Sequence, residues 1–500
     1  MSGKSSGGSA PTALFQGYNS VLGNGLSTAV DGKSAPDGAK SEVRCSVSIS
    51  IEELAQSLSI DQSLSVGFGP LGGIDEKVSF MTSLKVTTYS VSVTVYAKHV
   101  KGAESRTDVR FKSDIAIPQT DAQANQFVQY YGDSFVSRVV TGGEYMAVYT
   151  FYSQTKEEQT SLTTSLKANG IFDGVSVGGS LQTAMDNFLK TTKINYAFRQ
   201  TVTGLLNPQL PLPASFIDYA VKFPSIPLDA PVVIAIGSAG YETVPGAGTG
   251  FSKVAANRTY FTGNTVVGGL TSSLSRIVQS NNQIVWLGTL YAYYGGFSDP
   301  TLLANGKTAD GDIAAIQDQM NTFGSNPTAS FPKLSLKALD NGTPAVVYEI
   351  HESGYWGGGG GGPFDDVDIT TYIPRKTRIM SIGLRSGERT DQLRTTYMDD
   401  TGQQQTKSHG GTGGSDRGTL QLLPDQFVTR VWGRSGAKLD QLNIQISDGR
   451  VIGGGGGGGG GYSWTPPAGN FVLGFKGRCG AEVDGIQVVY ANFKPAVWKH

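Results

Sequence analysis

Apolar and polar residues alternate along much of the N-terminal two thirds of the chain. The alternation is clearest in three segments, Cys45–Ile51, Leu58–Gly69 and Tyr89–Ala97, which place serine or threonine at many of the second positions. Successive side chains of a strand point to opposite faces, so a period of two predicts strands with one apolar and one polar face. We therefore expect long, bent strands in a half-exposed antiparallel sheet.

Helical spacing is less common in this part of the chain. Residues 311–323 place Ile313, Ile316 and Met320 on one helix face, and Asp310 precedes them as a candidate N-cap. A region with many strands and few helices predicts an α+β fold.

The C-terminal part contains an internal repeat. Three segments share the order strand, tight turn, strand, and their equivalent glycines Gly387, Gly436 and Gly480 lie 49 and 44 residues apart. Glycine-rich stretches accompany the copies, at residues 357–362, 409–414 and 453–461. Three copies of one β unit predict three small antiparallel sheets around a pseudo-threefold axis, with their apolar faces turned inward.

Glycine content marks the boundary between the two parts. The last 147 residues contain 32 of the 68 glycines, and the first 353 contain the other 36. We therefore expect a flexible glycine- and serine-rich tail over residues 1–40, a first domain over residues 41–353 and a second domain over residues 354–500.

Charge and cysteine content exclude several classes of protein. The 40 basic and 41 acidic residues give a net charge of -1, which argues against an electrostatic grip on nucleic acid. Cys45 and Cys479 are too few for a disulfide framework or a cysteine zinc site. We find no apolar core of a secretory signal and no run near the ~18 apolar residues of a transmembrane helix. We expect a soluble monomer that is released by an unknown route.

The C-terminal motifs resemble those of jacalin-type lectins. In chain order they are GGGGGGPFDD (357–366), SHGGTGG (408–414), VTRVWGRSGAKLD (428–440) and FKGRCGAEVD (475–484). The resemblance covers about residues 354–493. It implies a β-prism, which is an all-β fold of three antiparallel sheets.

A Gly-x-x-x-Asp sequence occurs once in each copy and carries the candidate chemistry. The pairs are Gly387 with Asp391, Gly436 with Asp440, and Gly480 with Asp484. A fixed carboxylate accepts hydrogen bonds from two neighbouring sugar hydroxyls, and backbone N–H groups of the same turn return the complementary bonds. The alternative is that each aspartate only caps its own turn.

The lectin resemblance implies that a hexose binds between each aspartate and a glycine loop. Chain order pairs Asp484 with the loop around Gly358, Asp391 with residues 409–414, and Asp440 with the run that begins at Gly453. Glu482 and Val483, in the last turn, belong to the implied site. Four aromatic residues beside the loops either add stacking surfaces or are structural: Tyr355, Trp356, Tyr462 and Trp464.

A second motif lies in the N-terminal part. Tyr131-Gly132-Asp133-Ser134-Phe135 is followed, after a six-residue spacer, by Gly142-Gly143. This is similar to the signature of the membrane attack complex/perforin (MACPF) family, from which Asp133 is a departure. The resemblance implies that Gly142 and Gly143 form a hinge near the bend of the central sheet; the alternative is an ordinary turn or bulge. We expect Tyr131 and Phe135 to pack in the core in either case.

Two polar segments, residues 52–84 and 154–190, are ambiguous between helix and strand. The MACPF resemblance implies that they are helical clusters flanking the bent sheet. In lipid every backbone polar group must be paired, so such segments can cross a bilayer only as β-hairpins closed into a barrel. Four strands cannot enclose a water-filled lumen, so the barrel requires a ring of copies.

These interpretations together predict a pore-forming toxin that binds target-cell glycans, assembles into a ring and inserts a transmembrane β-barrel. The combination resembles bacterial MACPF toxins, including insecticidal ones. The alternative is a non-lytic carbohydrate-binding or adhesion protein with a MACPF-like scaffold. We expect no enzymatic activity, cofactor or metal, because catalytic motifs are absent and the four histidines lack metal-ligand spacing. The expected partners are glycans or glycolipids, the target membrane and further copies of the chain, and not nucleic acid.

Overall fold

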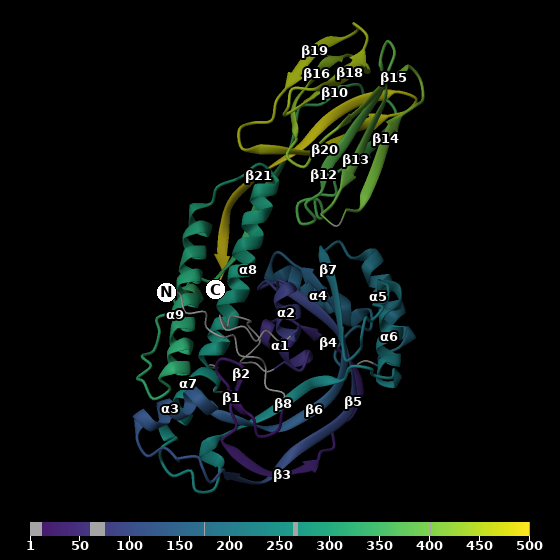
Figure 1. The fold of residues 1–500 in the computed structure, drawn as a ribbon. Helices are drawn as coiled ribbons and strands as arrows, with labels where there is room; N and C mark the ends of the chain where they lie inside the picture. The colour runs from purple at the N-terminus through teal and green to yellow at the C-terminus, as the bar shows by residue number, and fades with distance from the viewer. Residues whose placement is uncertain (1–12, 61–75, 175, 264–268, 401, 500) are drawn as a thin grey trace.

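The protein consists of a bent β-sheet surrounded by helices and a smaller all-β unit, which lies at the top of Figure 1. Two long helices and one long strand join the two parts. The computed structural model describes residues 13–60, 76–174, 176–263, 269–400 and 402–499. None of the helices in these ranges is both long enough and apolar enough to cross a membrane.

Eight strands form the N-terminal sheet. They are β1 (Gly17–Asn19), β2 (Asn24–Leu26), β3 (Val30–Pro36), β4 (Glu42–Ser48), β5 (Ser90–Phe111), β6 (Ser134–Tyr152), β7 (Tyr196–Thr203) and β8 (Val232–Gly240). β5 and β6 pair with each other over most of their length. The upper half of the sheet has the order β4-β5-β6-β7, and in the lower half β3 and β8 replace β4 and β7 as the outer strands.

Residues 17–36, which we expected in a flexible tail, belong to this sheet. β1 pairs with the start of β6, and β3 pairs with the far end of β5. The tail prediction is wrong for these residues, because backbone pairing to a long neighbouring strand orders even a segment with few apolar side chains. Residues 1–12 lie outside the described part of the chain.

The pair Gly142-Gly143 lies where the bent sheet changes its outer strands. Gly142 pairs with β8, whereas Glu144 pairs with β7. The β5–β6 ladder has a register shift at the same level, just after Val100. A Cβ atom on Gly142 would lie 2.0 Å from the carbonyl oxygen of His99, so a larger residue would force the strands apart.

The two ambiguous segments are largely helical in the described residues. The first contains α1 (Ile51–Ser57) and α2 (Glu76–Ser83), and the second contains α4 (Lys156–Ala168) and α5 (Gly179–Thr191). We call them the first and second helical clusters. The strand expected over Leu58–Gly69 is not formed at residues 58–59, which make a turn after α1, and residues 61–75 lie outside the described ranges.

Among the remaining helices, α6 (Phe216–Lys222) packs with α4 and α5 on the upper half of the sheet. The others connect the two parts or cover the lower half of the sheet. They are α3 (Asp121–Tyr131), α7 (Ser252–Thr262), α8 (Leu270–Tyr293), α9 (Pro300–Ser325) and α10 (Lys337–Asp340). The helix expected over residues 311–323 is longer than predicted. Its N-cap is Asp299, whose carboxylate accepts two N–H groups of the first turn, and Asp310 lies inside the helix.

The helical clusters cover opposite faces of the sheet. On one face, Val91 and Val93 of β5 share a core with the apolar residues of α4, α5 and α6. On the other face, Tyr96 of β5 packs with α1 and α2, and Ser92 and Thr94 are buried there as well. The alternation predicted for β5 is confirmed, but its polar face is covered by helices, so the sheet is not half-exposed.

A buried ion pair ties α2 to the bend of the sheet. Lys77 Nζ lies 2.7 Å from a carboxylate oxygen of Glu144 and donates a hydrogen bond to the carbonyl oxygen of Ile234. The hydroxyl of Tyr96 donates to the same carboxylate. Glu144 directly follows the glycine pair, so the first helical cluster is attached where the sheet changes direction.

Helix α8 contributes to three hydrophobic cores. Leu274 and Ile277 pack with α3, α7 and α9, and Val278 contacts the core under the first helical cluster. Leu287 and Leu290, further along the helix, pack into the core of the C-terminal unit.

The C-terminal unit is a prism of three antiparallel sheets, as predicted. One sheet contains β12 (Arg378–Ser386), β13 (Thr390–Met398), β14 (Gln404–Gly410) and β15 (Ser415–Gln421). The second contains β16 (Val428–Ser435), β17 (Leu439–Ile446), β18 (Val451–Gly455) and β19 (Gly460–Trp464). The third contains β9 (Thr343–Glu352), β10 (Trp356–Gly357), β11 (Gly362–Asp365), β20 (Asn470–Cys479) and β21 (Val483–Lys499). Leu393, Leu442 and Val488, one from each sheet, meet in the common core.

Strand β21 continues beyond the prism toward the helices (Figure 1). Its second half pairs with β9, and Phe493 packs against Tyr291 of α8 with ring centroids 4.8 Å apart. β9 precedes residue 353 but pairs within the C-terminal sheet, so the boundary expected there passes through this sheet.

The base of the prism also contacts the second helical cluster. Asn195, the residue before β7, donates a hydrogen bond of 2.7 Å to Asp400, and Lys193 lies 2.9 Å from Asp368. Burial raises the pKa of Asp400.

The residues of the N-terminal signature are buried structural groups. Gly132 ends α3 with a φ of 81°, Phe135 is fully buried, and Tyr131 packs on Phe127 with centroids 4.9 Å apart. These contacts agree with the packing role that we expected for the two aromatic residues.

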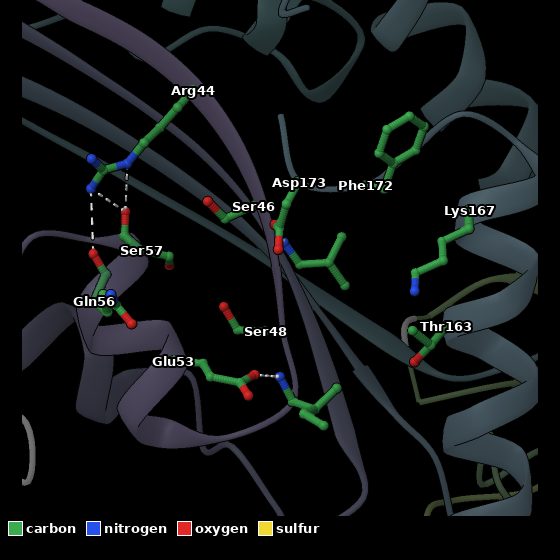
Figure 2. Close-up of a pocket in the computed structure, with 12 residues that line it drawn as sticks. Arg44, Ser46, Ser48, Glu53, Gln56, Ser57, Thr163, Lys167, Phe172 and Asp173 are labelled. Atoms are coloured by element: carbon green, nitrogen blue, oxygen red, sulfur yellow. Dashed lines mark hydrogen bonds between the residues drawn. The ribbon is translucent and has the colours of Figure 1, made fainter. Parts of the chain in front are cut away.

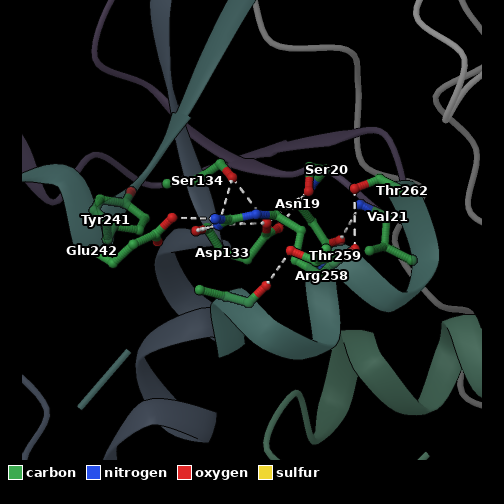
Figure 3. A network of polar contacts seen from close by, with 12 residues as sticks. Asn19, Ser20, Val21, Asp133, Ser134, Tyr241, Glu242, Arg258, Thr259 and Thr262 are labelled. Atoms are coloured by element: carbon green, nitrogen blue, oxygen red, sulfur yellow. Dashed lines mark hydrogen bonds and ion pairs between the residues drawn. The ribbon is translucent and has the colours of Figure 1, made fainter. Parts of the chain in front are cut away.

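Asp133 is the centre of a buried polar network (Figure 3). Its carboxylate accepts hydrogen bonds from the N–H and hydroxyl of Ser20, each 2.7 Å long, and from the hydroxyl of Ser134. Arg258 of α7 donates to the Asp133 carbonyl oxygen and pairs with Glu242. Asp133, the residue that departs from the MACPF signature, thus joins the start of the chain, the central strand β6 and α7.

We expect Asp133→Asn to lower the free energy of unfolding by about 3 kcal/mol, because it removes the charge that faces Arg258 in a buried network. Asp31→Asn is the matched control, since Asp31 pairs with Arg110 at the surface and should change the free energy by less than about 1 kcal/mol. Urea unfolding measures both values. Equal stability losses in the two variants would contradict the role given to Asp133.

Candidate functional site

Three equivalent turns meet at the end of the prism far from the helices. They join β12 to β13, β16 to β17 and β20 to β21. Each turn is closed by the same hydrogen bond, from the N–H of its first glycine to the carbonyl oxygen two residues later; the pairs are Gly387 with Arg389, Gly436 with Lys438, and Gly480 with Glu482. The sequence repeat is therefore a repeat of one backbone geometry.

Each turn aspartate lies against the glycine loop that chain order assigned to it. A Cβ atom on Gly413 would lie 2.3 Å from Asp391 Oδ1, and one on Gly458 would lie 2.7 Å from Asp440 Oδ1. The third loop repeats this contact, with Gly360 at 2.7 Å from Asp484 Oδ1. No side chain fits between loop and carboxylate, which explains why these positions are glycine.

Gly358 contacts both its own aspartate and the neighbouring turn. Its N–H donates a hydrogen bond of 2.8 Å to the carbonyl oxygen of Asp484. A Cβ atom on Gly358 would lie 1.9 Å from the carbonyl oxygen of Ala437, in the neighbouring turn. In the same way, a Cβ atom on Gly411 would meet the carbonyl oxygen of Ala481, and one on Gly456 would meet the carbonyl oxygen of Glu388. Each glycine loop therefore faces its own aspartate on one side and packs against the next turn on the other, so the three sites interlock.

Three arginines that we did not predict hold the glycine loops. Arg385 donates hydrogen bonds of 3.0 and 2.9 Å to the carbonyl oxygens of Gly413 and Gly414. Arg434 and Arg478 make the same two bonds to their own loops. A sequence signal was present, because an arginine stands two residues before the first glycine of the turn in all three repeats. A bidentate guanidinium fixes both carbonyl groups and thereby the loop beside the aspartate.

The side chains of Glu482 and Val483 contact other protein groups. The Glu482 carboxylate lies 2.7 Å from Lys438 Nζ and 3.1 Å from Arg389 Nη1, and the hydrogen bond from Lys438 holds its pKa below the usual range. Val483 is fully buried. The Glu482 side chain thus connects the three turns and the Val483 side chain packs in the core, which leaves the backbone of the turn as their part of the implied site.

The three sites differ in access. Asp391 and Asp440 are half-buried, whereas Asp484 is 4% exposed and lies 3.5 Å from the ammonium of Lys438. An aspartate beside a glycine loop offers carboxylate oxygens to neighbouring hydroxyl groups. Asp391 and Asp440 are the more accessible acceptors.

Most of the nearby aromatic residues are structural. Trp356 stacks on Tyr462 at 4.7 Å, and Trp464 packs on Tyr490 at 5.1 Å. Tyr355 is 41% exposed, and its hydroxyl donates to the carbonyl oxygen of Gly358. Tyr355 is thus the aromatic surface beside the Asp484 site.

Asp366 is bound by the hydroxyl of Tyr397 and by His409 Nε2, at 2.9 and 2.6 Å. Within the described ranges, no three side chains of histidine, cysteine, aspartate or glutamate are grouped as metal ligands.

A known protein family matches the residues that form the three turns. A family model of the jacalin-like lectin domain matches residues 353–489. Similar solved structures include the Malaysian banana lectin, with 25% identity, 29% of this chain and 99% of that chain covered, and a TM-score of 0.25. A mannose-binding jacalin-related lectin from Ananas comosus has 26% identity over 29% of this chain and 99% of its own, with a TM-score of 0.25. A mannose-specific jacalin-related lectin from Morus nigra, in complex with mannose, has 26% identity over 28% and 94%, also with a TM-score of 0.25.

The family match and the threefold repeat of turn, aspartate and glycine loop cover the same residues. Residues 353–489 of this chain form a jacalin-like lectin domain.

Proposed function

We propose that this protein is a glycan-directed pore-forming protein whose N-terminal part is a MACPF domain. In this proposal a soluble monomer docks on surface glycans through the lectin domain and assembles with other copies into a ring. The two helical clusters then unfold and become transmembrane β-hairpins. No catalytic step is involved.

The observation that carries the proposal is the place of the helical clusters in the sheet. Each is inserted between two neighbouring antiparallel strands, β4 and β5 or β6 and β7. Both insertions lie at the same end of the sheet, because Ser90 at the start of β5 pairs with Tyr152 at the end of β6. A cluster that becomes two strands therefore lengthens an existing hairpin and breaks no ladder of the sheet.

The second helical cluster has the residue pattern that such a hairpin needs. Between residues 162 and 186, glycines aside, apolar and polar residues alternate on both sides of Asp173-Gly174, with Thr164, Ile171, Thr183 and Ala184 as exceptions. The apolar set is Leu162, Leu166, Ala168 and Phe172, then Val177, Leu181 and Met185. The polar set is Thr163, Ser165, Lys167 and Asn169, then Ser180, Gln182 and Asp186. Such alternation suits strands with one face in lipid and the other in a water-filled lumen.

The length of the second helical cluster also suits this task. Residues 153–195 would give each strand about 20 residues, or roughly 65 Å. The prism takes up roughly 30 Å of that reach, since the nine residues of β13 run from the glycan-site end to the base beside Asn195. The remaining length of about 35 Å exceeds the ~30 Å hydrocarbon layer of a bilayer.

Ring assembly is supported by the two outer strands of the upper half-sheet. Among the described strands, β4 pairs only with β5 and β7 only with β6. The β7 edge of one copy is antiparallel to the β4 edge of the next if the sheets continue each other. A head-to-tail contact between two different edges generates rings.

Several linked lectin sites suit docking on a surface covered with glycans. Single protein–hexose contacts are weak, and linked sites multiply their effect through a high local concentration. The three turns lie at the end of the prism away from the sheet, so bound glycans would face the direction in which the hairpins extend.

The decisive experiment measures dye release from liposomes that carry hexose-terminated glycolipids, together with electron microscopy of the same sample. We expect leakage and rings that depend on the glycolipid. Glycan binding without leakage or rings under every lipid composition would refute pore formation and favour the non-lytic adhesion protein.

We expect Asp391→Ala and Asp440→Ala each to weaken binding to a glycan array by at least about tenfold, because each removes a charged hydrogen-bond acceptor. Asp484→Ala should have a smaller effect, since this carboxylate is buried beside Lys438. Asp425→Ala, an exposed position outside the three turns, is the control. Undiminished binding after replacement of all three turn aspartates would place the sugar site elsewhere.

We expect an environment-sensitive dye on Ala168→Cys to enter a lipid environment when the protein acts on glycolipid liposomes, and a dye on Lys167→Cys to stay in water; both positions are exposed in the folded protein and can be labelled there. The alternation puts these neighbours on opposite faces of the proposed strand. Cys479→Ser removes one native thiol, and burial raises the pKa of the other, Cys45, to about 12, which suppresses its labelling. Equal dye spectra at the two positions would argue against a strand in this segment.

A further inference from the structure

A polar groove of about 800 Å³ runs along the outer edge of β4 (Figure 2). Residues of β4 form its floor, α1 borders one side, and α4 with the loop after it borders the other. Arg44 closes one end, because its guanidinium donates hydrogen bonds of 3.3 and 2.9 Å to the carbonyl oxygen of Ser57. The floor is thus an open strand edge held between the two helical clusters.

The backbone of this edge points into the groove at alternate residues. The N–H of Val47 donates to a side chain outside the sheet, so it faces away from β5. Hydrogen-bonding directions alternate along an antiparallel strand, so the N–H groups of Val43 and Cys45 face the same way. An edge of this kind is a template for another strand.

Two carboxylates occupy the end of the edge where the first helical cluster begins. Glu53 of α1 accepts from the N–H of Ile49 at 2.7 Å, and Asp173 accepts from the N–H of Val47 at 2.6 Å. Glu53 acts within its own helix start, next to the N-cap Ser50. Asp173 is different, because it reaches the edge from the loop between α4 and α5, 126 residues away in the chain.

We propose that Asp173 guards the β4 edge against pairing with a second copy of this chain, and that withdrawal of Asp173 from the N–H of Val47 removes the guard. The proposal rests on the proposed function, because it concerns the same assembly step. It adds an order of events, in which Asp173 leaves the edge first, the neighbour pairs next, and the helical clusters unfold after the ring has formed.

The partner that fits this edge is β7 of another copy. On β4, Val43 and Cys45 face the core that also contains Tyr196 and Phe198 of β7, so a continued sheet would place apolar side chains on one common face.

The Asp173 carboxylate blocks this pairing directly. It already accepts the hydrogen bond from the N–H group of Val47, which would otherwise be donated to a carbonyl oxygen of the incoming strand. It would also remain beside the new strand as an unpaired charge, which desolvation makes unfavourable.

A labelled peptide with the sequence of residues 196–203 tests the guard without any membrane. We expect it to bind Asp173→Ala about tenfold more tightly than the wild-type protein, the factor expected for loss of one charge-assisted hydrogen bond. Asp173→Asn keeps an oxygen acceptor at the same place and should stay within about threefold of the wild type. A scrambled peptide and hydrogen exchange of the β4 amides serve as controls for sequence and for local folding.

Equal peptide affinity for Asp173→Ala and the wild type would overturn the guard, whatever the protein does on membranes. Glycolipid liposomes provide the second arm, where Asp173→Ala should form rings about tenfold faster than the wild type. Failure of both proteins to form rings, together with tighter peptide binding by Asp173→Ala, would refute the proposed pore and leave the guarded edge in place.

Discussion

The burial of helix α8 in three separate cores is the constraint on which the arrangement of this molecule depends. Ile277 belongs to the helical core, Val278 contacts the core beneath the first helical cluster, and Leu290 lies in the core of the prism. Close-packed cores resist deformation, so a helix shared by three of them restricts rotation of the prism against the sheet. The contact between Asn195 and Asp400 adds the second helical cluster to the same body. Lectin sites and sheet therefore keep a fixed relative direction in this conformation.

Much of the fold follows from local pattern, but the surroundings of each element do not. The alternation in β5 predicts a strand, yet it does not show that helices cover the face of Ser92 and Thr94. The second helical cluster has a pattern compatible with both helix and strand, and burial of Leu166 and Met185 against the sheet selects the helix here. The glycine- and serine-rich composition of residues 17–36 wrongly predicted a flexible tail, because these residues are ordered by pairing with strands that are distant in the sequence.

The candidate site was predictable where the repeat fixes the geometry. Three copies of one turn, in the same order relative to three glycine loops, sufficed to pair Asp391, Asp440 and Asp484 with their loops. The ion pairs of Glu482 with Arg389 and Lys438 were not predictable, because the three turns come together only in the folded prism. The three arginines that bind the glycine loops occupy the same position in each repeat, but this pattern does not reveal their role until the carbonyl groups that they bind are known.

Strand β21 gives the molecule a mechanical property. It starts at the turn that contains Asp484, runs through the prism and ends at Lys499, whose ammonium lies 3.2 Å from Glu157 of the second helical cluster. A surface that is bound at the Asp484 end of the prism and pulls on it would apply force to the β9–β21 hydrogen bonds parallel to the two strands. All of these hydrogen bonds then share the force, whereas a pull across the strands would break them one after another. The connection between tip and sheet is accordingly strongest along the line from anchorage to body.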